Sequence, residues 1–148
     1  GLAAWFDTFR VCQAAEVWQA HGPWVETTRP AFGPGVADRF HMASDITAEA
    51  WARARTARQA IAARVSTVVG PDALMVLPSS PGPAPHRDAD EPTLDAFRGR
   101  ALRLLCAAGL AGLPQLSMPC ATVEGAPVGL SLAGPPGSER TLLAAAAG

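Results

Sequence analysis

The sequence contains no lysine, tyrosine or asparagine, so arginine supplies all twelve of its basic side chains. The lack of lysine excludes a phosphate-binding loop that ends in Gly-Lys-Ser or Gly-Lys-Thr, so we interpret "GPPGSERT" at residues 134–141 as a turn before a helix. Thirteen acidic residues leave a net charge of -1, and no basic stripe is present. We therefore expect neither nucleic acid nor a membrane surface as a partner.

Cysteine and histidine are equally scarce. Cys12, Cys106 and Cys120 are odd in number, far apart and set in apolar sequence, which predicts buried thiols in a reducing compartment rather than disulfides. We accordingly predict a cytoplasmic location. The three histidines are isolated from one another and from the cysteines: they are His21, His41 and His86. No pair has the spacing of metal ligands, so we predict no metal site and no cofactor.

Long apolar runs are also missing. None reaches the roughly 20 residues that span a bilayer, and the first residues lack the basic start and cleavage site of a signal peptide. The chain opens on Gly1 rather than methionine and stops within the helical pattern "LLAAAAG", so we expect both ends to be cut. With 49% hydrophobic residues over 148 positions, residues 1–148 are predicted to form a single partial domain with a core.

Apolar residues at steps of three and four predict four helices, over residues 3–20, 36–44, 47–69 and 93–108. Residues 21–35 carry three prolines and three glycines and are predicted to be an irregular connection. Arg58 lies on the apolar stripe of the third helix, so its side chain either extends to solvent or meets an acid, and we favour solvent. Thr47, Thr93 and Ser138 are predicted N-caps, and glycine ends the fourth helix near residue 112.

Short apolar runs between prolines and glycines predict strands at residues 73–78, 114–119 and 127–134. The first resembles a strand buried on both faces, and a strand that follows a helix favours the α/β class. Residues 78–92 hold five prolines and no apolar period, which indicates a Pro-rich loop at a functional edge or a mobile segment.

Candidate nucleophiles are Ser79, Ser80 and Cys120, with His86 as a base. The prolines around the serines remove backbone N–H groups that would stabilise an oxyanion, so a Ser80–His86 pair is disfavoured, although a small enzyme that uses Ser80 or Cys120 stays open. Cys120 has no nearby cation to lower its pKa. Asp88, Asp90 and Glu91 lie close together in the sequence. We interpret them as solvent-exposed residues of a loop rather than as a catalytic acid–base pair.

The order of several segments carries a family resemblance. They are "FRVCQAAEVW", "HGPWV", "FGPGVADRF", "GPDALMVLPSSPGPAP", "FRGRALRLLCAAGLAGLPQLSMP" and "APVGLSLAGPPGSERTLL". Together they resemble the C-terminal part of the amidase signature family, and within it the indole-3-acetamide amidohydrolases of plants and their bacterial relatives.

This resemblance implies a partial α/β/α sandwich with a mixed sheet, and hydrolysis of carboxamides to an acid and ammonia. The family's Ser–Ser–Lys triad needs a lysine that this chain lacks, so the resemblance places no catalytic residue here and implies that the chain alone is inactive. The family's loop near the substrate matches Cys120, Ala121 and Thr122. Asp72 matches a hydrogen-bonding residue at a strand entry.

Two hypotheses follow. In the first, the chain is the C-terminal part of an amidohydrolase whose substrate is a small amide, such as indole-3-acetamide. In the alternative, it is a non-catalytic amidase remnant, a folding or interaction module that self-associates through exposed apolar surface.

Overall fold

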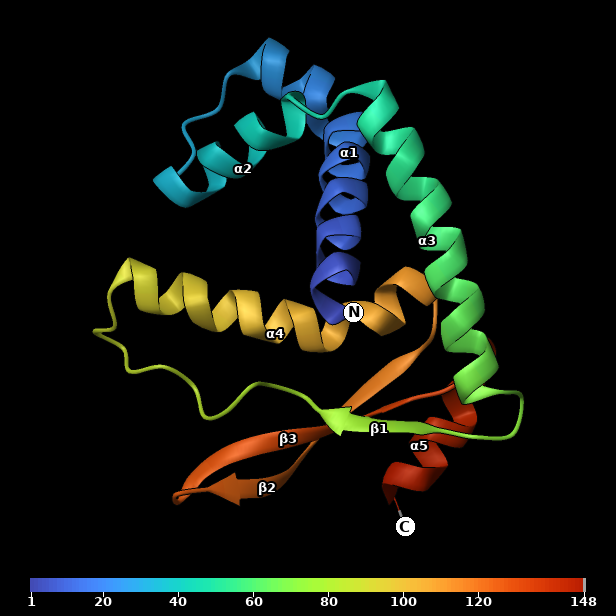
Figure 1. The fold of residues 1–148 in the computed structure, drawn as a ribbon. Helices are drawn as coiled ribbons and strands as arrows, with labels where there is room; N and C mark the ends of the chain where they lie inside the picture. Colours follow the sequence, from blue (N-terminus) through green and yellow to red (C-terminus); the bar gives the residue numbers. More distant parts are fainter. Residues whose placement is uncertain (148) are drawn as a thin grey trace.

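The computed structural model describes residues 1–147, which form a helical layer, a small sheet and a final helix (Figure 1). The helices are α1 (Leu2–Thr28), α2 (Pro34–Ser44), α3 (Ala48–Val69), α4 (Glu91–Ala111) and α5 (Glu139–Ala147). The strands are β1 (Met75–Pro78), β2 (Gln115–Val123) and β3 (Ala126–Ala133). In Figure 1, α1 to α4 lie above the sheet and α5 lies below it, which confirms the predicted α/β class.

The strand order is β1-β3-β2, and both pairings are antiparallel. Leu77 of β1 and Ser117 of β2 both face Ser131 of β3 across the ladder. Glu124 and Gly125 join β2 to β3 with φ angles of 51° and 79°, the left-handed geometry that two-residue hairpin turns require. The sheet of the described residues is thus antiparallel, with β3 in its middle.

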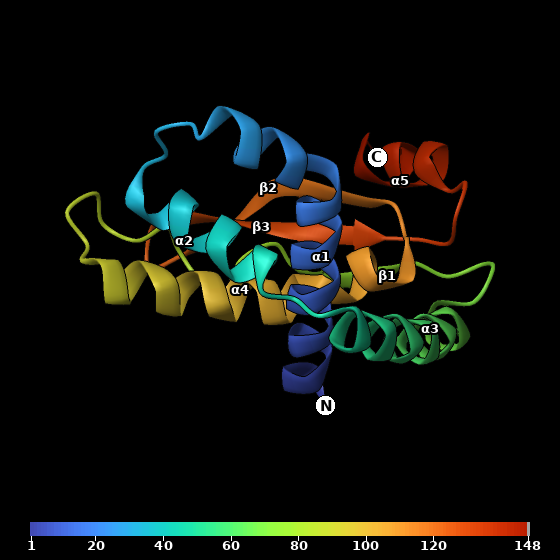
Figure 2. The same cartoon turned by 90° about the horizontal axis from the view of Figure 1, so that it is seen from above.

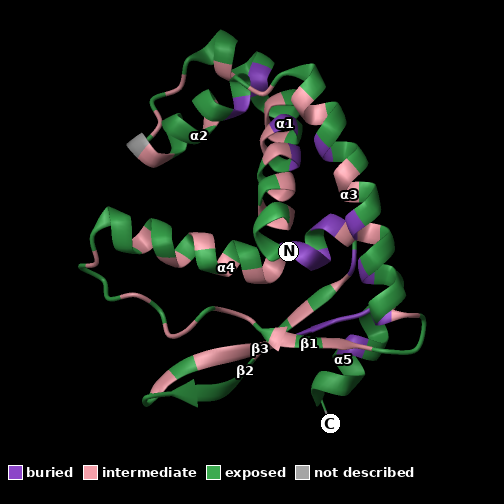
Figure 3. Ribbon diagram, viewed as in Figure 1, coloured by how far each residue is buried: buried purple, intermediate pink, exposed green. Residues whose placement is uncertain are grey.

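The core lies between the helical layer and one face of the sheet. Val65 and Val69 of α3, Cys106 and Leu110 of α4, and Ala133 of β3 belong to one buried cluster. In Figure 3 the buried residues gather where α3, the end of α4 and β3 meet. Most of the helix surface away from this junction is exposed or half-buried.

Helix α5 covers part of the opposite face of the sheet. Leu132 alternates with Ala133 along β3 and therefore points to this face, where it is buried. Helix α5 contacts β2, and its Leu142 is 2% exposed. Helices thus lie on both sides of the sheet (Figure 1), with α5 next to β2 (Figure 2).

Helix α1 is longer than predicted, because the expected irregular connection at residues 21–35 is helical up to Thr28. Pro23 removes one backbone donor from the helix interior, and α1 changes direction near its C-terminal end instead of stopping (Figure 2). The helix ends at Arg29, whose φ of 44° is left-handed. Gly22 is required here, since a Cβ would lie 2.9 Å from the Trp18 ring.

The helix caps follow the predictions in part. Thr47 accepts a hydrogen bond from the Ala50 N–H at 3.2 Å, and Gly112 ends α4 in the left-handed conformation, as predicted. Thr93 is not an N-cap: α4 begins earlier, and the Asp90 carboxylate accepts from the Thr93 N–H at 3.0 Å. Aspartate caps a helix better than threonine, which explains the earlier start. The Ser138 carbonyl accepts a hydrogen bond from the Leu142 N–H, but no hydrogen bond to the Ser138 hydroxyl caps α5 among the described residues.

Two further predictions are wrong. The first strand is shorter than expected, and it is not buried on both faces, because the face to which Val76 points is left uncovered among the described residues and Val76 is 61% exposed. Arg58 does not extend to solvent. Its Nε donates to the Leu110 carbonyl at 3.1 Å and its Nη1 to Glu16 at 3.0 Å, so it links α3 to α4 and α1.

Candidate functional site

Three serines form a hydrogen-bonded chain across the sheet, here called the serine chain. The Ser79 and Ser131 hydroxyl oxygens are 2.8 Å apart, and those of Ser131 and Ser117 are 2.9 Å apart. Ser79 directly follows β1, two residues beyond Leu77, so its side chain lies on the same sheet face as Ser131. Ser131 is fully buried, whereas Ser117 is exposed.

The number of hydrogens in the serine chain determines what it can bind. Each hydroxyl donates one hydrogen and accepts at two lone pairs, so two bonds between three hydroxyls leave one hydrogen unused. A buried hydroxyl that does not donate is costly, so we assign the fully buried Ser131 as donor to one neighbour and acceptor from the other, and the unused hydrogen then lies at one end. Ser79 and Ser117 are these ends, and either can donate while the other accepts. No histidine or carboxylate side chain bonds to the serine chain among the described residues, so it lacks the base that activates a nucleophile.

A cavity of about 430 Å³, here called the sheet cavity, adjoins the serine chain. It lies between the strand ends, the start of the Pro-rich loop and Phe97 of α4. Its lining is uncharged: Ser79, Ser80, Gly82, Ala84, Pro85, Phe97, Ser117, Met118, Pro119, Pro127, Val128 and Gly129. Apolar walls with a few hydroxyls suit a small neutral ligand that carries one polar group.

Gly129 lets the loop approach the sheet at this cavity. A Cβ there would lie 2.9 Å from the Ser79 hydroxyl and 3.0 Å from the Met118 carbonyl oxygen. The Ser79 N–H donates to the Gly129 carbonyl at 2.8 Å, so the backbone holds Ser79 against β3. A larger residue at position 129 would displace the first member of the serine chain.

The predicted substrate residues Cys120, Ala121 and Thr122 lie elsewhere, on the outer part of β2. They follow an irregularity in the pairing between Met118 and Ala121, and all three are exposed. They line neither the sheet cavity nor a second cavity between α1, α2 and α4. Their contact with substrate stays a prediction.

The structure divides the three cysteines. Cys12 and Cys106 are 4% and 2% exposed, as predicted, and burial raises the pKa of both thiols. Cys120 is exposed, so its predicted burial is wrong. All three are free thiols.

The disfavoured Ser80–His86 pair does not form. The Ser80 hydroxyl donates to the Gly82 carbonyl at 2.7 Å, and His86 is exposed. Asp72 is exposed, and its expected role at the strand entry stays a prediction. The neighbouring acids are exposed, as predicted, but Asp90 also caps α4.

Sequence reasoning missed Ser117 and Ser131. Each sits between two large apolar residues within a predicted strand, in "LSM" and "LSL". When two apolar strands that are neighbours in the sequence each carry a single serine near the middle, the two hydroxyls are candidates for a hydrogen-bonded cross-strand pair. Because neither serine follows a strand end or a glycine turn, the search for nucleophiles did not include them.

No helix among residues 1–147 combines the length and the apolar character that crossing a bilayer requires. The same residues hold no group of three or more metal-ligating side chains.

Known proteins match almost the entire chain. The family described as Amidase matches residues 20–143. "Amidase 1" of Arabidopsis thaliana is 35% identical over 142 residues, which cover 96% of this chain and 33% of that protein. "Outer envelope protein 64, chloroplastic" of Arabidopsis thaliana is 26% identical over 137 residues, 93% of this chain and 23% of that protein. Since this relative is named for a chloroplast membrane, the cytoplasmic location stays a prediction.

A solved structure titled "Crystal structure of amidase" matches the fold with a TM-score of 0.81 and 25% identity, over 98% of this chain and 34% of that one. The chain spans about a third of the length of the Arabidopsis Amidase 1 that it matches. The matched family residues include the serine chain and the sheet cavity. The chain therefore belongs to the Amidase family.

Proposed function

We propose that the chain is the C-terminal part of an amidohydrolase, in which it provides the sheet and one wall of the substrate pocket. The observation that carries this proposal is the match of 98% of the chain to a third of an amidase fold. The reaction is addition of water to a carboxamide, with release of a carboxylic acid and ammonia. The proposed catalytic Ser–Ser–Lys group belongs to polypeptide outside residues 1–148, because this sequence has no lysine.

The sheet cavity supports an arylacetamide, such as indole-3-acetamide, as the substrate. Phe97 and Met118 offer apolar contact to a ring, and the ends of the serine chain offer one donor and one acceptor. A primary carboxamide presents the complementary acceptor and donor. Cys120, Ala121 and Thr122 are proposed to contact the acyl side of the same substrate.

The test compares this chain with a chimera in which it replaces the matching third of Arabidopsis Amidase 1. Ammonia released from indole-3-acetamide is measured by a coupled enzymatic assay. We expect release by the chimera and none by the 148-residue chain, because only the chimera contains a lysine base. Release by the chain alone would refute the missing-lysine argument.

A control isolates the pocket. Ser117→Ala in the chimera removes one end of the serine chain, and we expect KM for the amide to rise with a smaller effect on kcat. Ser66→Ala, on the exposed surface of α3, removes a hydroxyl far from the cavity and should change neither constant. A chimera that hydrolyses the amide with unchanged KM after Ser117→Ala would contradict the assigned pocket.

The alternative function, a non-catalytic interaction module, is supported by exposed apolar side chains. Val68, Val76 and Leu143 are 74%, 61% and 59% exposed. Apolar surface of this kind promotes association between copies. Sedimentation velocity distinguishes the two proposals, because a monomer at all concentrations argues against self-association.

A further inference from the structure

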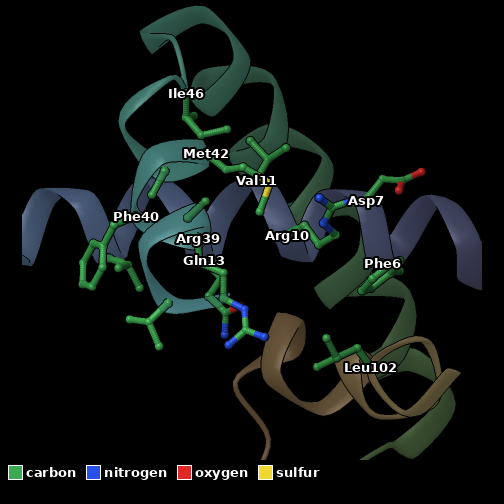
Figure 4. Close-up of a pocket in the computed structure, with 14 residues that line it drawn as sticks. Phe6, Asp7, Arg10, Val11, Gln13, Arg39, Phe40, Met42, Ile46 and Leu102 are labelled. Atoms are coloured by element: carbon green, nitrogen blue, oxygen red, sulfur yellow. The ribbon is translucent and has the colours of Figure 1, made fainter. Parts of the chain in front are cut away.

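A second cavity, here called the helical cavity, lies between α1, α2 and the middle of α4 (Figure 4). Its volume of about 530 Å³ is within the roughly 300–1,000 Å³ of small-molecule sites. Most of its lining is apolar: Phe6, Val11, Ala14, Val17, Val36, Phe40, Met42, Ala43, Ile46 and Leu102. It differs from the sheet cavity because charged side chains also reach it.

Two arginines and one aspartate are these charged residues: Arg10, Arg39 and Asp7. Neither arginine forms an ion pair within residues 1–147, where the pairs are Arg58–Glu16 and Arg98–Asp95. The walls are thus apolar and the excess charge is positive. An anion with an apolar body is the ligand that satisfies both features.

An aromatic ring lies near one of these cations. The Arg10 guanidinium carbon lies 5.7 Å from the centre of the Phe6 ring, which itself lines the cavity. Arg103 lies 5.6 Å from the same ring and adds positive charge nearby. A guanidinium that stacks on a ring uses its flat face, which leaves its N–H edge available for a carboxylate.

Arg39 approaches from the other helix. It lies on α2, on the same wall as Phe40 and Met42, whereas Arg10 lies on α1 (Figure 4). Paired N–H groups of guanidinium match the two oxygens of a carboxylate.

We propose that the helical cavity binds a monocarboxylate with an aromatic or aliphatic body, whose carboxylate pairs with Arg39, while Arg10 adds positive charge at the same cavity. The apolar body contacts Phe40 and Leu102. This site is separate from the sheet cavity, and it does not depend on the amide hydrolysis proposed above.

Isothermal titration calorimetry of the 148-residue chain with phenylacetate tests the proposal. We expect saturable binding that weakens about tenfold in Arg39→Gln, the usual effect of losing one charged hydrogen-bond partner. Arg39→Lys should lose less affinity for phenylacetate, since lysine keeps the positive charge. Arg64→Gln removes the same charge from the exposed face of α3 and should leave the affinity unchanged.

Three results would overturn the proposal. They are the absence of phenylacetate binding, equal affinity for wild type and Arg39→Gln, and equal weakening by Arg39→Gln and Arg64→Gln. Phenylacetamide serves as the neutral probe, and its affinity should not respond to Arg39→Gln. Circular dichroism checks that each variant is folded, and if Arg39→Gln is not, Arg10→Gln replaces it. Because binding is measured without turnover, its failure is distinct from failure of the ammonia assay.

Discussion

Removing the central hydroxyl of the serine chain should destabilise the protein by a calculable amount. Ser131 is fully buried, and it bonds to Ser79 at 2.8 Å and to Ser117 at 2.9 Å. Each such hydrogen bond stabilises a folded protein by about 0.5–1.5 kcal/mol, so Ser131→Ala should lower the free energy of unfolding by about 1–3 kcal/mol.

The variant Ser117→Ala tests whether the three serines stabilise the fold as one hydrogen-bonded unit. It breaks one bond and leaves Ser131 paired with Ser79, so we expect a loss of about 0.5–1.5 kcal/mol. In the Ser131→Ala background the same change has no bond left to break, so it should cost close to nothing. The difference is a coupling free energy of about 1 kcal/mol.

Urea unfolding followed by circular dichroism measures all four proteins of this cycle. Ser66→Ala on the exposed surface of α3 is the matched control and should stay within about 0.5 kcal/mol of wild type. Additive losses, or a Ser131→Ala loss no larger than that of Ser66→Ala, would refute the serine chain as a stabilising unit.

Three other predictions concern the core, the thiols and a helix cap. Leu110→Ala, at a site 2% exposed, should cost about 2–5 kcal/mol in urea unfolding; a loss below about 1 kcal/mol contradicts its place in the core. Cys120 should react with iodoacetamide in the native protein, whereas Cys12 and Cys106 should react only after denaturation, since burial also raises the pKa of both thiols. Mass spectrometry of tryptic peptides reads this out, and early labelling of Cys106 would contradict it. The hydrogen bonds that cap α4 lower the Asp90 pKa, so the carboxylate stabilises the fold above its ordinary pKa of about 3.9, and this contribution is lost as the pH falls through the lowered value. Wild type should therefore lose more stability than Asp90→Asn on acidification, and parallel losses in thermal melts would disprove the charge effect.

Local features of the chain were largely predictable. The apolar period located α3 and the strands β2 and β3, while Thr47 and Gly112 marked helix ends by their ordinary capping chemistry. Errors occurred where two local signals competed. Residues 21–35 were expected to be irregular because of their prolines and glycines, but the one donor that Pro23 removes only bends α1, which continues to Thr28.

Long-range contacts were not predictable in the same way. Arg58 was expected to extend to solvent rather than to meet an acid, yet it donates to Glu16, which lies on another helix. Two arginines face one cavity because α1 and α2 pack together. The spacing of residues along the sequence does not predict which side chains of different helices come to lie at one cavity.

The sequence by itself determined the helices, the strands, the lack of a lysine base and the resemblance to amidases, because each depends on residues close together in the chain or on composition. Only the tertiary structure decided the serine chain and the two cavities. The period of a strand says which residues share a face, but strand order and register decide that Ser79, Ser131 and Ser117 meet. Strand order and register follow from how the three strands pair with one another and pack against the helices.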